Sequence, residues 1–170
     1  MDEYSKQLWK ELFPSERELI PPETNAAEHT ESALDHYTSP VLLERAAYLR
    51  KLAKLGDGSA SETLREYPQH SIMLSVRIRS GIAEMHEEFA DLFFVLDGRA
   101  TLVTGGTITD PKSVGLGEIR GSCVSGGSQQ QLRAGDVAHV AAGTPHQMLL
   151  AGDKTLTCLV VKIQQRPQEQ

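Results

Sequence analysis

Cysteine is scarce in this chain of 170 residues, which has only Cys123 and Cys158. Two cysteines are too few for the disulfide framework that stabilises many small secreted domains. Cys158 lies in the apolar stretch "TLTCLVV", so we expect its side chain to be buried. A reducing, cytoplasmic location is the expectation that follows.

Clusters of basic residues and long apolar stretches are also missing. The chain has 17 Lys and Arg against 23 Asp and Glu, a net charge of −6, and no basic run of five or more residues. Nucleic-acid binding would need a concentrated positive face, so this class of function is excluded. The apolar runs are far shorter than the ~18 residues of a membrane span. The opening "MDEYSKQLWKELF" has mixed charge, unlike a secretory signal. The expected partners therefore include no nucleic acid and no membrane.

Two segments differ in the spacing of their apolar residues. In residues 1–67 apolar side chains recur at helical spacing, whereas after Pro68 they alternate as in strands. The length is typical of a single domain with a sizeable core. We therefore expect 1–67 to form an N-terminal helical arm, packed on the rest of the chain or on a partner, and 68–166 to form a β barrel or sandwich.

The N-terminal arm is expected to contain three helices. The first is short and amphipathic and ends at Pro14, after which the polar stretch 14–38 forms an extended arm. The second begins near Ser39, which can cap its N-terminus, and ends at Gly56. The third covers about residues 61–67, where "SETLREY" opens with a serine followed by a glutamate. We expect these helices to serve packing or dimerisation rather than chemistry.

The remaining sequence predicts many short strands joined by glycine turns. In "SIMLSVRIRSG" apolar residues alternate with mostly polar ones, which gives a strand two different faces. Asp97-Gly98 is a hairpin turn signal. The glycine-rich residues 104–132 are too many for a hairpin loop, so we expect an ordered excursion with short strands of its own. This pattern is typical of an all-β sandwich or barrel.

The stretch "EMHEEFADLFFVLDG", residues 84–98, combines a histidine and acidic groups with an apolar strand-like run. Glu84 and His86 are two residues apart and would face the same side of a strand. A turn over residues 87–90 would place Asp91 in the next strand across from His86, where partners lie about 5 Å apart at Cβ. His146, from a distant hairpin, would complete a group of two imidazoles and one carboxylate if the barrel brings it in.

These stretches resemble the two sequence motifs of the cupin superfamily, whose members are small double-stranded β-helix barrels. "AEMHEEFADLFFVLDGRATLVTGG" resembles the first motif, because Asp91 and Gly98 match its acidic residue and glycine and His86 stands at its second histidine. "AGDVAHVAAGTPHQM" resembles the second motif through Gly135, Asp136, Gly143 and His146. The resemblance covers about residues 70–163. More narrowly, the stretches "GEIRG" and "ATLVTGG" resemble the corresponding stretches of a bacterial group of small single-domain cupins, whose activity is generally unassigned.

Two positions depart from the cupin motifs. Glu84 stands where the usual pair has its first histidine, and Ala141 stands where the second motif has proline. Taking His86 as the first histidine instead would make Glu88 its partner and put Asp91 one residue too close. The first alignment is therefore preferred.

The resemblance implies a mainly β fold, the cupin double-stranded β-helix or jelly-roll barrel, with an N-terminal helical segment. It also implies a metal site at His86, Asp91 and His146, to which Glu84 could add an oxygen ligand. Two imidazoles and one carboxylate suit non-haem Fe(II) and tolerate Mn, Ni or Zn, and Glu84 would favour harder ions such as Mn. Without a metal, His86 and Asp91 would form a hydrogen-bonded pair in a wet barrel mouth. Both alternatives stay open.

Strand alternation assigns other residues to the cavity or to the outer face. Phe93 and Val95 share the side of Asp91 and are expected to line the cavity. His139 would either line the cavity or lie on the outer face of the barrel. The alternate residues of the same strand form a second apolar face, which predicts contact with helices or another subunit and hence a homodimer. These residues are Leu92, Phe94 and Leu96.

Three functions fit these features. The first is a metal-dependent enzyme, such as a dioxygenase or an isomerase acting on a small oxygenated molecule. The second is a non-catalytic protein with a degenerate metal site that binds a sugar-like or carboxylate ligand. The third is a structural or regulatory oligomer that interacts through its N-terminal segment. Whether the chain is an enzyme stays open, because one fold hosts many chemistries.

Overall fold

The structure, a computed structural model, describes residues 34–165. The predicted helix before Pro14 and most of the predicted extended arm lie outside the described residues. Within that range the chain forms one helix followed by twelve strands. In chain order they are α2 (Ser39–Leu55), β1 (Ser59–Glu66), β2 (His70–Arg77), β3 (Ala83–His86), β4 (Phe89–Thr104), β5 (Thr107–Ile108), β6 (Lys112–Gly115), β7 (Glu118–Gly121), β8 (Val124–Ser125), β9 (Ser128–Arg133), β10 (Val137–Val140), β11 (His146–Leu149) and β12 (Leu156–Gln164).

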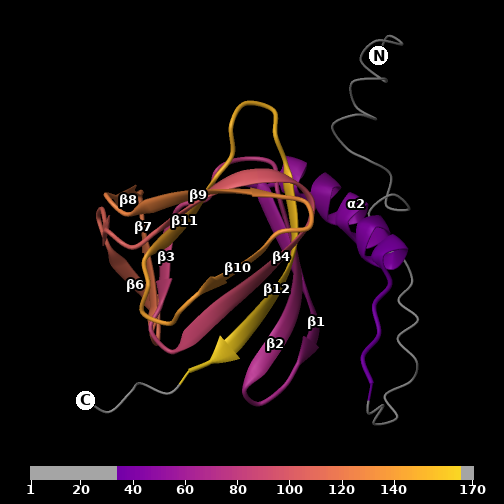
Figure 1. The fold of residues 1–170 in the computed structure, drawn as a ribbon, viewed down its shortest axis with the longest axis horizontal. Coiled ribbons are helices and arrows are strands. Elements are labelled where there is room, and N and C mark those ends of the chain that lie inside the picture. Colours follow the sequence, from indigo (N-terminus) through magenta and orange to yellow (C-terminus); the bar gives the residue numbers. More distant parts are fainter. Residues whose placement is uncertain (1–33, 166–170) are drawn as a thin grey trace, which may run out of the picture.

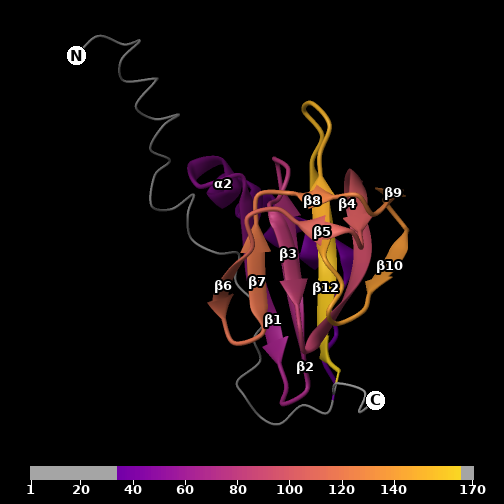
Figure 2. The same ribbon diagram turned by 90° about the vertical axis from the view of Figure 1, so that its left-hand side faces the viewer.

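The strands curl into two antiparallel layers that share β4 (Figures 1 and 2). One layer has the order β1-β2-β12-β4, and β10 also pairs with β4. The other runs from β4 through β11, β3 and β7 to β6, and β9 also pairs with β4. The first half of β4 pairs with β12 and β10, whereas its second half, from Arg99, pairs with β9 and β11. This topology is a double-stranded β-helix, and the predicted fold class is confirmed.

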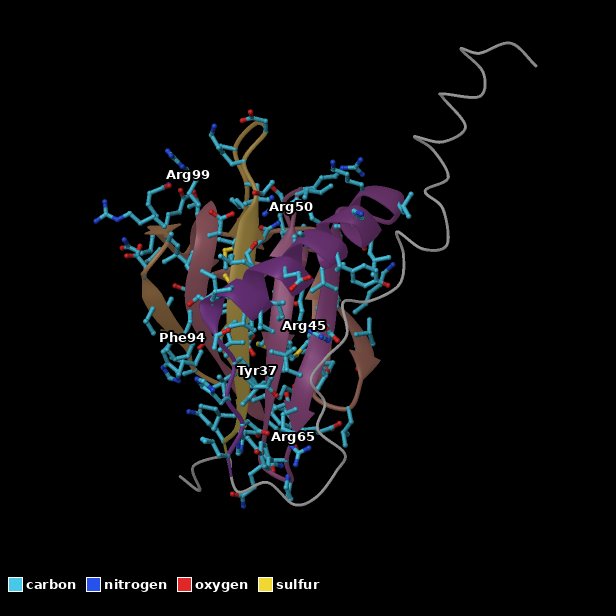
Figure 3. All side chains as sticks on the ribbon, turned by 90° about the vertical axis from the view of Figure 1, so that its right-hand side faces the viewer. Tyr37, Arg45, Arg50, Arg65, Phe94 and Arg99 are labelled. Carbon is cyan, nitrogen blue, oxygen red and sulfur yellow. The ribbon has the colours of Figure 1, made fainter. Side chains whose placement is uncertain are left out.

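Helix α2 covers the outer face of the layer that contains β1 and β2 (Figures 1 and 3). Pro40 lies in its first turn, and the Gly56 N–H donates to the Leu52 carbonyl at 3.0 Å where the helix ends. The N-cap is Thr38 rather than the predicted Ser39. Because β2 packs one face against α2, its alternate residues face the barrel interior. The buried residues between helix and sheet are Leu42, Ala46, Leu49, Leu74 and Val76.

The predicted third helix over residues 61–67 is wrong, since residues 61–66 belong to β1. This strand pairs with β2 over nearly its whole length, and Leu64 packs against the apolar cluster under α2. The Arg45 Nε of α2 donates to Glu62 Oε2 at 3.0 Å. Pairing with β2 and packing under α2 outweigh the weak helical preference of "SETLREY".

The predicted hairpin at Asp97-Gly98 is also wrong, because β4 continues through both residues. Gly98 has φ +86°, and a Cβ at this position would lie 2.0 Å from the Thr155 carbonyl oxygen. The ladder with β12 shifts register between Thr157 and Cys158. Glycine therefore provides a local irregularity and a close approach where β4 passes from one layer to the other.

The glycine-rich residues 104–132 form an ordered excursion, as predicted, with the short strands β5 to β9. Strand β7 of this excursion pairs with β3, so the excursion extends the layer that contains β3. No helix within residues 34–165 is long and apolar enough to cross a membrane.

The outward apolar face of β4 is partly covered by α2. Leu96 packs against the apolar cluster under the helix, as expected for an outward-facing residue. Leu92 and Phe94 are half-buried, and Phe94 lies to the side of α2 (Figure 3). The homodimer that this face suggested stays a prediction.

Candidate metal centre

Four side chains with metal-ligating groups meet in the barrel from three strands. Glu84 and His86 come from β3, Asp91 lies near the start of β4, and His146 begins β11. His146 is the direct cross-strand partner of Glu84. The expected pairing of His86 with Asp91 on adjacent strands is wrong, because β3 pairs with β11 and β7. The two side chains nevertheless meet inside the barrel, so the four residues singled out from the sequence lie together.

The four ligand atoms all lie within 4.8 Å of one another. Oδ2 of Asp91 is 3.2 Å from Nε2 of His86 and 3.4 Å from Nε2 of His146. Oε1 of Glu84 is 3.4 Å from Nε2 of His146. His86, Asp91 and His146 are at most 3% exposed, so water screens these contacts little.

Both imidazoles are held through their Nδ1 atoms. Nδ1 of His86 lies 2.8 Å from both carboxylate oxygens of Glu118, which Arg120 also contacts at 2.9 Å. Nδ1 of His146 lies 3.0 Å from the Thr144 carbonyl oxygen, which can only accept a hydrogen bond. Contacts of this kind fix the tautomer and direction of a ligating histidine, leaving each Nε2 facing the carboxylates. Sequence reasoning missed Glu118, because nothing local marks one glutamate of the excursion as a neighbour of β3.

Carboxylates and imidazoles in the cluster stabilise each other's charges. Burial raises the pKa of Asp91, but its contacts with both histidines and a nearby lysine outweigh burial and hold that pKa well below its usual range. Burial likewise raises the pKa of Glu84, yet His146 and two arginines lower it to about 2. Burial lowers the pKa of His146, whereas the two carboxylates raise it to about 9. The carboxylates therefore favour a positive charge at Nε2 of His146, supplied by a proton or by a metal ion.

Three basic side chains border the cluster. Nζ of Lys162 lies 3.2 Å from Oδ1 of Asp91. Arg120 and Arg77 approach Glu84 from β7 and β2, with Nη2 to carboxylate distances of 3.6 and 3.9 Å. Sequence reasoning did not assign these cations to the site. The alternation in β2 was the one usable signal, because it placed Arg77 on the face opposite the apolar one.

The cluster lines a cavity of about 220 Å³ inside the barrel. Phe93 lines this cavity, as predicted. Val95 is buried in the apolar core beyond the lining residues, and His139 is exposed on β10, where it pairs with Leu92. The cavity assignment of these two residues is therefore wrong, and the outer-face alternative holds for His139. The remaining lining residues are Ser61, Met73, Ser75, Arg77, Arg120, Met148, Leu156, Cys158, Val160 and Lys162.

The donor set fits a divalent metal ion held by the four residues. Atoms that share one ion through bonds of about 2.1 Å lie about 3.0–3.4 Å apart, and the closest contacts in the cluster match this spacing. Within the described part of the chain, Nε2 of His146 is buried and makes no hydrogen bond, while two carboxylate oxygens lie 3.4 Å from it. A cation between this nitrogen and the carboxylates would bind all of them. Imidazole and carboxylate ligands suit Fe, Mn, Ni or Zn.

Comparison with known proteins finds similar solved structures at low sequence identity. No family model and no curated protein matches the sequence. Solved structures that are similar include an uncharacterized conserved protein with a double-stranded β-helix domain from Klebsiella pneumoniae (16% identity, 63% of this chain and 77% of that chain, TM-score 0.47). Another is a cupin superfamily protein from Desulfitobacterium hafniense (19% identity, 67% of this chain and 88% of that chain, TM-score 0.44). A third is a predicted oxalate decarboxylase from Thermotoga maritima (16% identity, 63% of this chain and 81% of that chain, TM-score 0.47).

At these identities the likeness concerns the fold alone. The class rests on the chain itself, because the strand topology is a double-stranded β-helix and the motif residues stand on β3, β4 and β11 around one cavity. The protein has the cupin fold.

Proposed function

We propose that this cupin barrel binds a divalent metal ion through Glu84, His86, Asp91 and His146 and acts on a small oxygenated molecule as a metal-dependent dioxygenase or isomerase. The observation that carries this proposal is the convergence of four ligand atoms within 4.8 Å at the wall of a cavity. A molecule in the cavity would lie next to the cluster, since all four residues line it. The metal would supply Lewis-acid or O₂ chemistry there.

The protein's own side chains would orient the ligand and keep water away from it. Glu118 and the Thr144 carbonyl hold the two imidazoles, so the direction of each Nε2 is set before a ligand enters. Met73, Phe93 and Val160 supply apolar walls. Nζ of Lys162 is buried beside Asp91 and would hold a proton next to the bound molecule.

A non-catalytic protein that binds a sugar-like or carboxylate ligand is the second candidate. One observation favours it. Within residues 34–165, the cavity lining has no carboxylate or imidazole outside the four-residue cluster. With all four bound to a metal, Lys162 would be the main group left for proton transfer, and a binding protein needs no such group.

Metal analysis is the first test of the proposal. Protein purified without chelator or affinity tag is expected to contain near-stoichiometric Mn, Fe, Ni or Zn. His86→Ala should lose the metal, whereas the control His139→Ala, which changes an exposed histidine of β10, should keep it. Wild-type protein that stays metal-free after incubation with each of the four ions would contradict the proposal.

Product analysis then separates an enzyme from a binding protein. Turnover of a small diol, keto acid or sugar that is lost in His86→Ala and kept in His139→Ala would support the enzyme. Stoichiometric metal with ligand binding and no turnover across the three compound classes would favour the second candidate.

A further inference from the structure

We infer that the cavity holds the carboxylate group of its ligand at Arg77, Ser75 and Ser61, beside the candidate metal centre. This inference rests on the proposed function and deepens it by naming the ligand class. The ligand would be a small carboxylic acid with a second oxygen that reaches the metal cluster, as in a hydroxy acid or a keto acid.

The three side chains form one polar strip on a wall of the cavity. Ser75 and Arg77 are two residues apart on β2, and Ser61 is the direct cross-strand partner of Ser75 on β1. All three line the cavity. Leu74 and Val76, on the other face of β2, are fully buried under α2. The strip therefore keeps its direction, because a slip in register would expose core residues.

The strip presents hydrogen-bond donors that the described part of the protein does not use. The guanidinium of Arg77 has five N–H donors, and its contact with Glu84 is an ion pair at 3.9 Å, longer than a hydrogen bond. Neither Ser61 nor Ser75 has a side-chain hydrogen bond to another residue of 34–165. A carboxylate accepts two parallel N–H bonds from a guanidinium and further bonds from hydroxyls, so it matches the unused donors.

A neighbouring glycine leaves room for the guanidinium of Arg77. At Gly81 an added Cβ would lie 2.7 Å from Nη1 of Arg77 and 3.1 Å from its Cζ. The chain after β2 thus leaves room for the guanidinium where a larger residue would displace it. Arg77 lies 3.9 Å from Glu84, which in turn lies 3.4 Å from His146. A hydroxy acid or keto acid whose carboxylate binds Arg77 would therefore have its hydroxyl or keto oxygen near the metal cluster.

The charges around the cavity favour an anion over a neutral sugar. Three basic side chains and three carboxylates lie in and beside the cavity. The basic side chains are Arg77, Arg120 and Lys162, and the carboxylates are Glu84, Asp91 and Glu118. With neutral histidines these charges balance, so a divalent ion would make the loaded cavity positive. A carboxylate offsets this charge and a sugar does not. The volume of about 220 Å³ equals roughly seven water molecules at ~30 Å³ each, enough for an acid of a few carbons.

Calorimetric titration of metal-loaded, full-length protein with lactate and with lactamide tests the inference. The two probes share a hydroxyl and differ in the carboxylate. Lactate is expected to bind about tenfold more tightly than lactamide or better. Arg77→Gln should abolish this preference, and Ser75→Ala should weaken lactate binding about threefold. The control Arg79→Gln makes the same charge change at an exposed residue and should keep the preference.

Metal content, measured on the same samples, separates the two proposals. If the wild type holds metal but binds the two probes equally, or binds neither, the carboxylate subsite is overturned while the proposed function stands. A preference for lactate that survives in Arg77→Gln would also overturn it. If the wild type holds no metal, the proposed function fails. In that case, a wild-type preference for lactate that disappears in Arg77→Gln would still support the subsite. Equal binding of lactate and lactamide by the wild type would overturn the subsite as well.

Discussion

Glu118 should control metal affinity although it is not a ligand. Both of its carboxylate oxygens lie 2.8 Å from Nδ1 of His86, whose ring is buried. Partners of this kind typically contribute 10–100-fold to metal affinity, or ~1.4–2.7 kcal/mol. Glu118→Gln keeps an acceptor and removes a charge that Arg120 partly neutralises, so we expect a loss of about tenfold. Glu118→Ala removes acceptor and charge, so the loss should approach a hundredfold.

Zinc affinity, measured by competition with a chromophoric chelator at one fixed pH, checks this prediction. Zinc is redox-inert, so oxidation cannot change the result. Glu87→Gln is the matched control, because Glu87 is an exposed carboxylate adjacent to His86 in the sequence. Circular dichroism would establish that each variant is folded. A folded Glu118→Ala variant with wild-type zinc affinity would refute the reasoning that ring orientation sets the strength of this site.

Three further predictions concern the fold around the site. Leu74→Ala, at a fully buried position under α2, should lower the free energy of unfolding in urea by about 2–5 kcal/mol; a loss below ~1 kcal/mol would contradict the packing. Gly98→Ala should lower the melting temperature more than Gly135→Ala, because both glycines have positive φ but only at Gly98 would the Cβ meet a backbone oxygen; equal melting temperatures would count against this bend of β4. Burial raises the pKa of the Cys158 thiol to about 12. A thiol reagent at about pH 8 should therefore label only the exposed Cys123 until the protein unfolds. Rapid labelling of both cysteines in the folded protein would show that Cys158 is accessible.

Local patterns in the sequence predicted the strands that carry the site. Alternation in β2 separates Leu74 from Ser75 and Arg77, and the structure places the first against α2 and the other two in the cavity. The resemblance to the cupin motifs placed His86 and His146 in one site although sixty residues separate them. The faces of a strand can be predicted because the strand period is a property of neighbouring residues.

The errors arose where distant parts of the chain decide the structure. Residues 61–67 read as helix until β2 and α2 are present to pair and pack with them. Asp97-Gly98 has the composition of a hairpin turn, yet β4 continues through it. The loop before β12 packs closely against Gly98 where β4 passes from one layer to the other. Glu118 and Lys162 reach the site from β7 and β12, and their neighbours are set by sheet order rather than by sequence. Propensity alone cannot supply that order.

Anomalous X-ray diffraction at the absorption edge of the bound metal, on crystals of protein purified without chelator, tests the central claim most directly. The account predicts one anomalous peak per chain, within bonding distance of Nε2 of His86, Nε2 of His146 and a carboxylate oxygen of Asp91. A peak elsewhere on the protein, or none in crystals soaked with Mn, Fe, Ni or Zn, would contradict it.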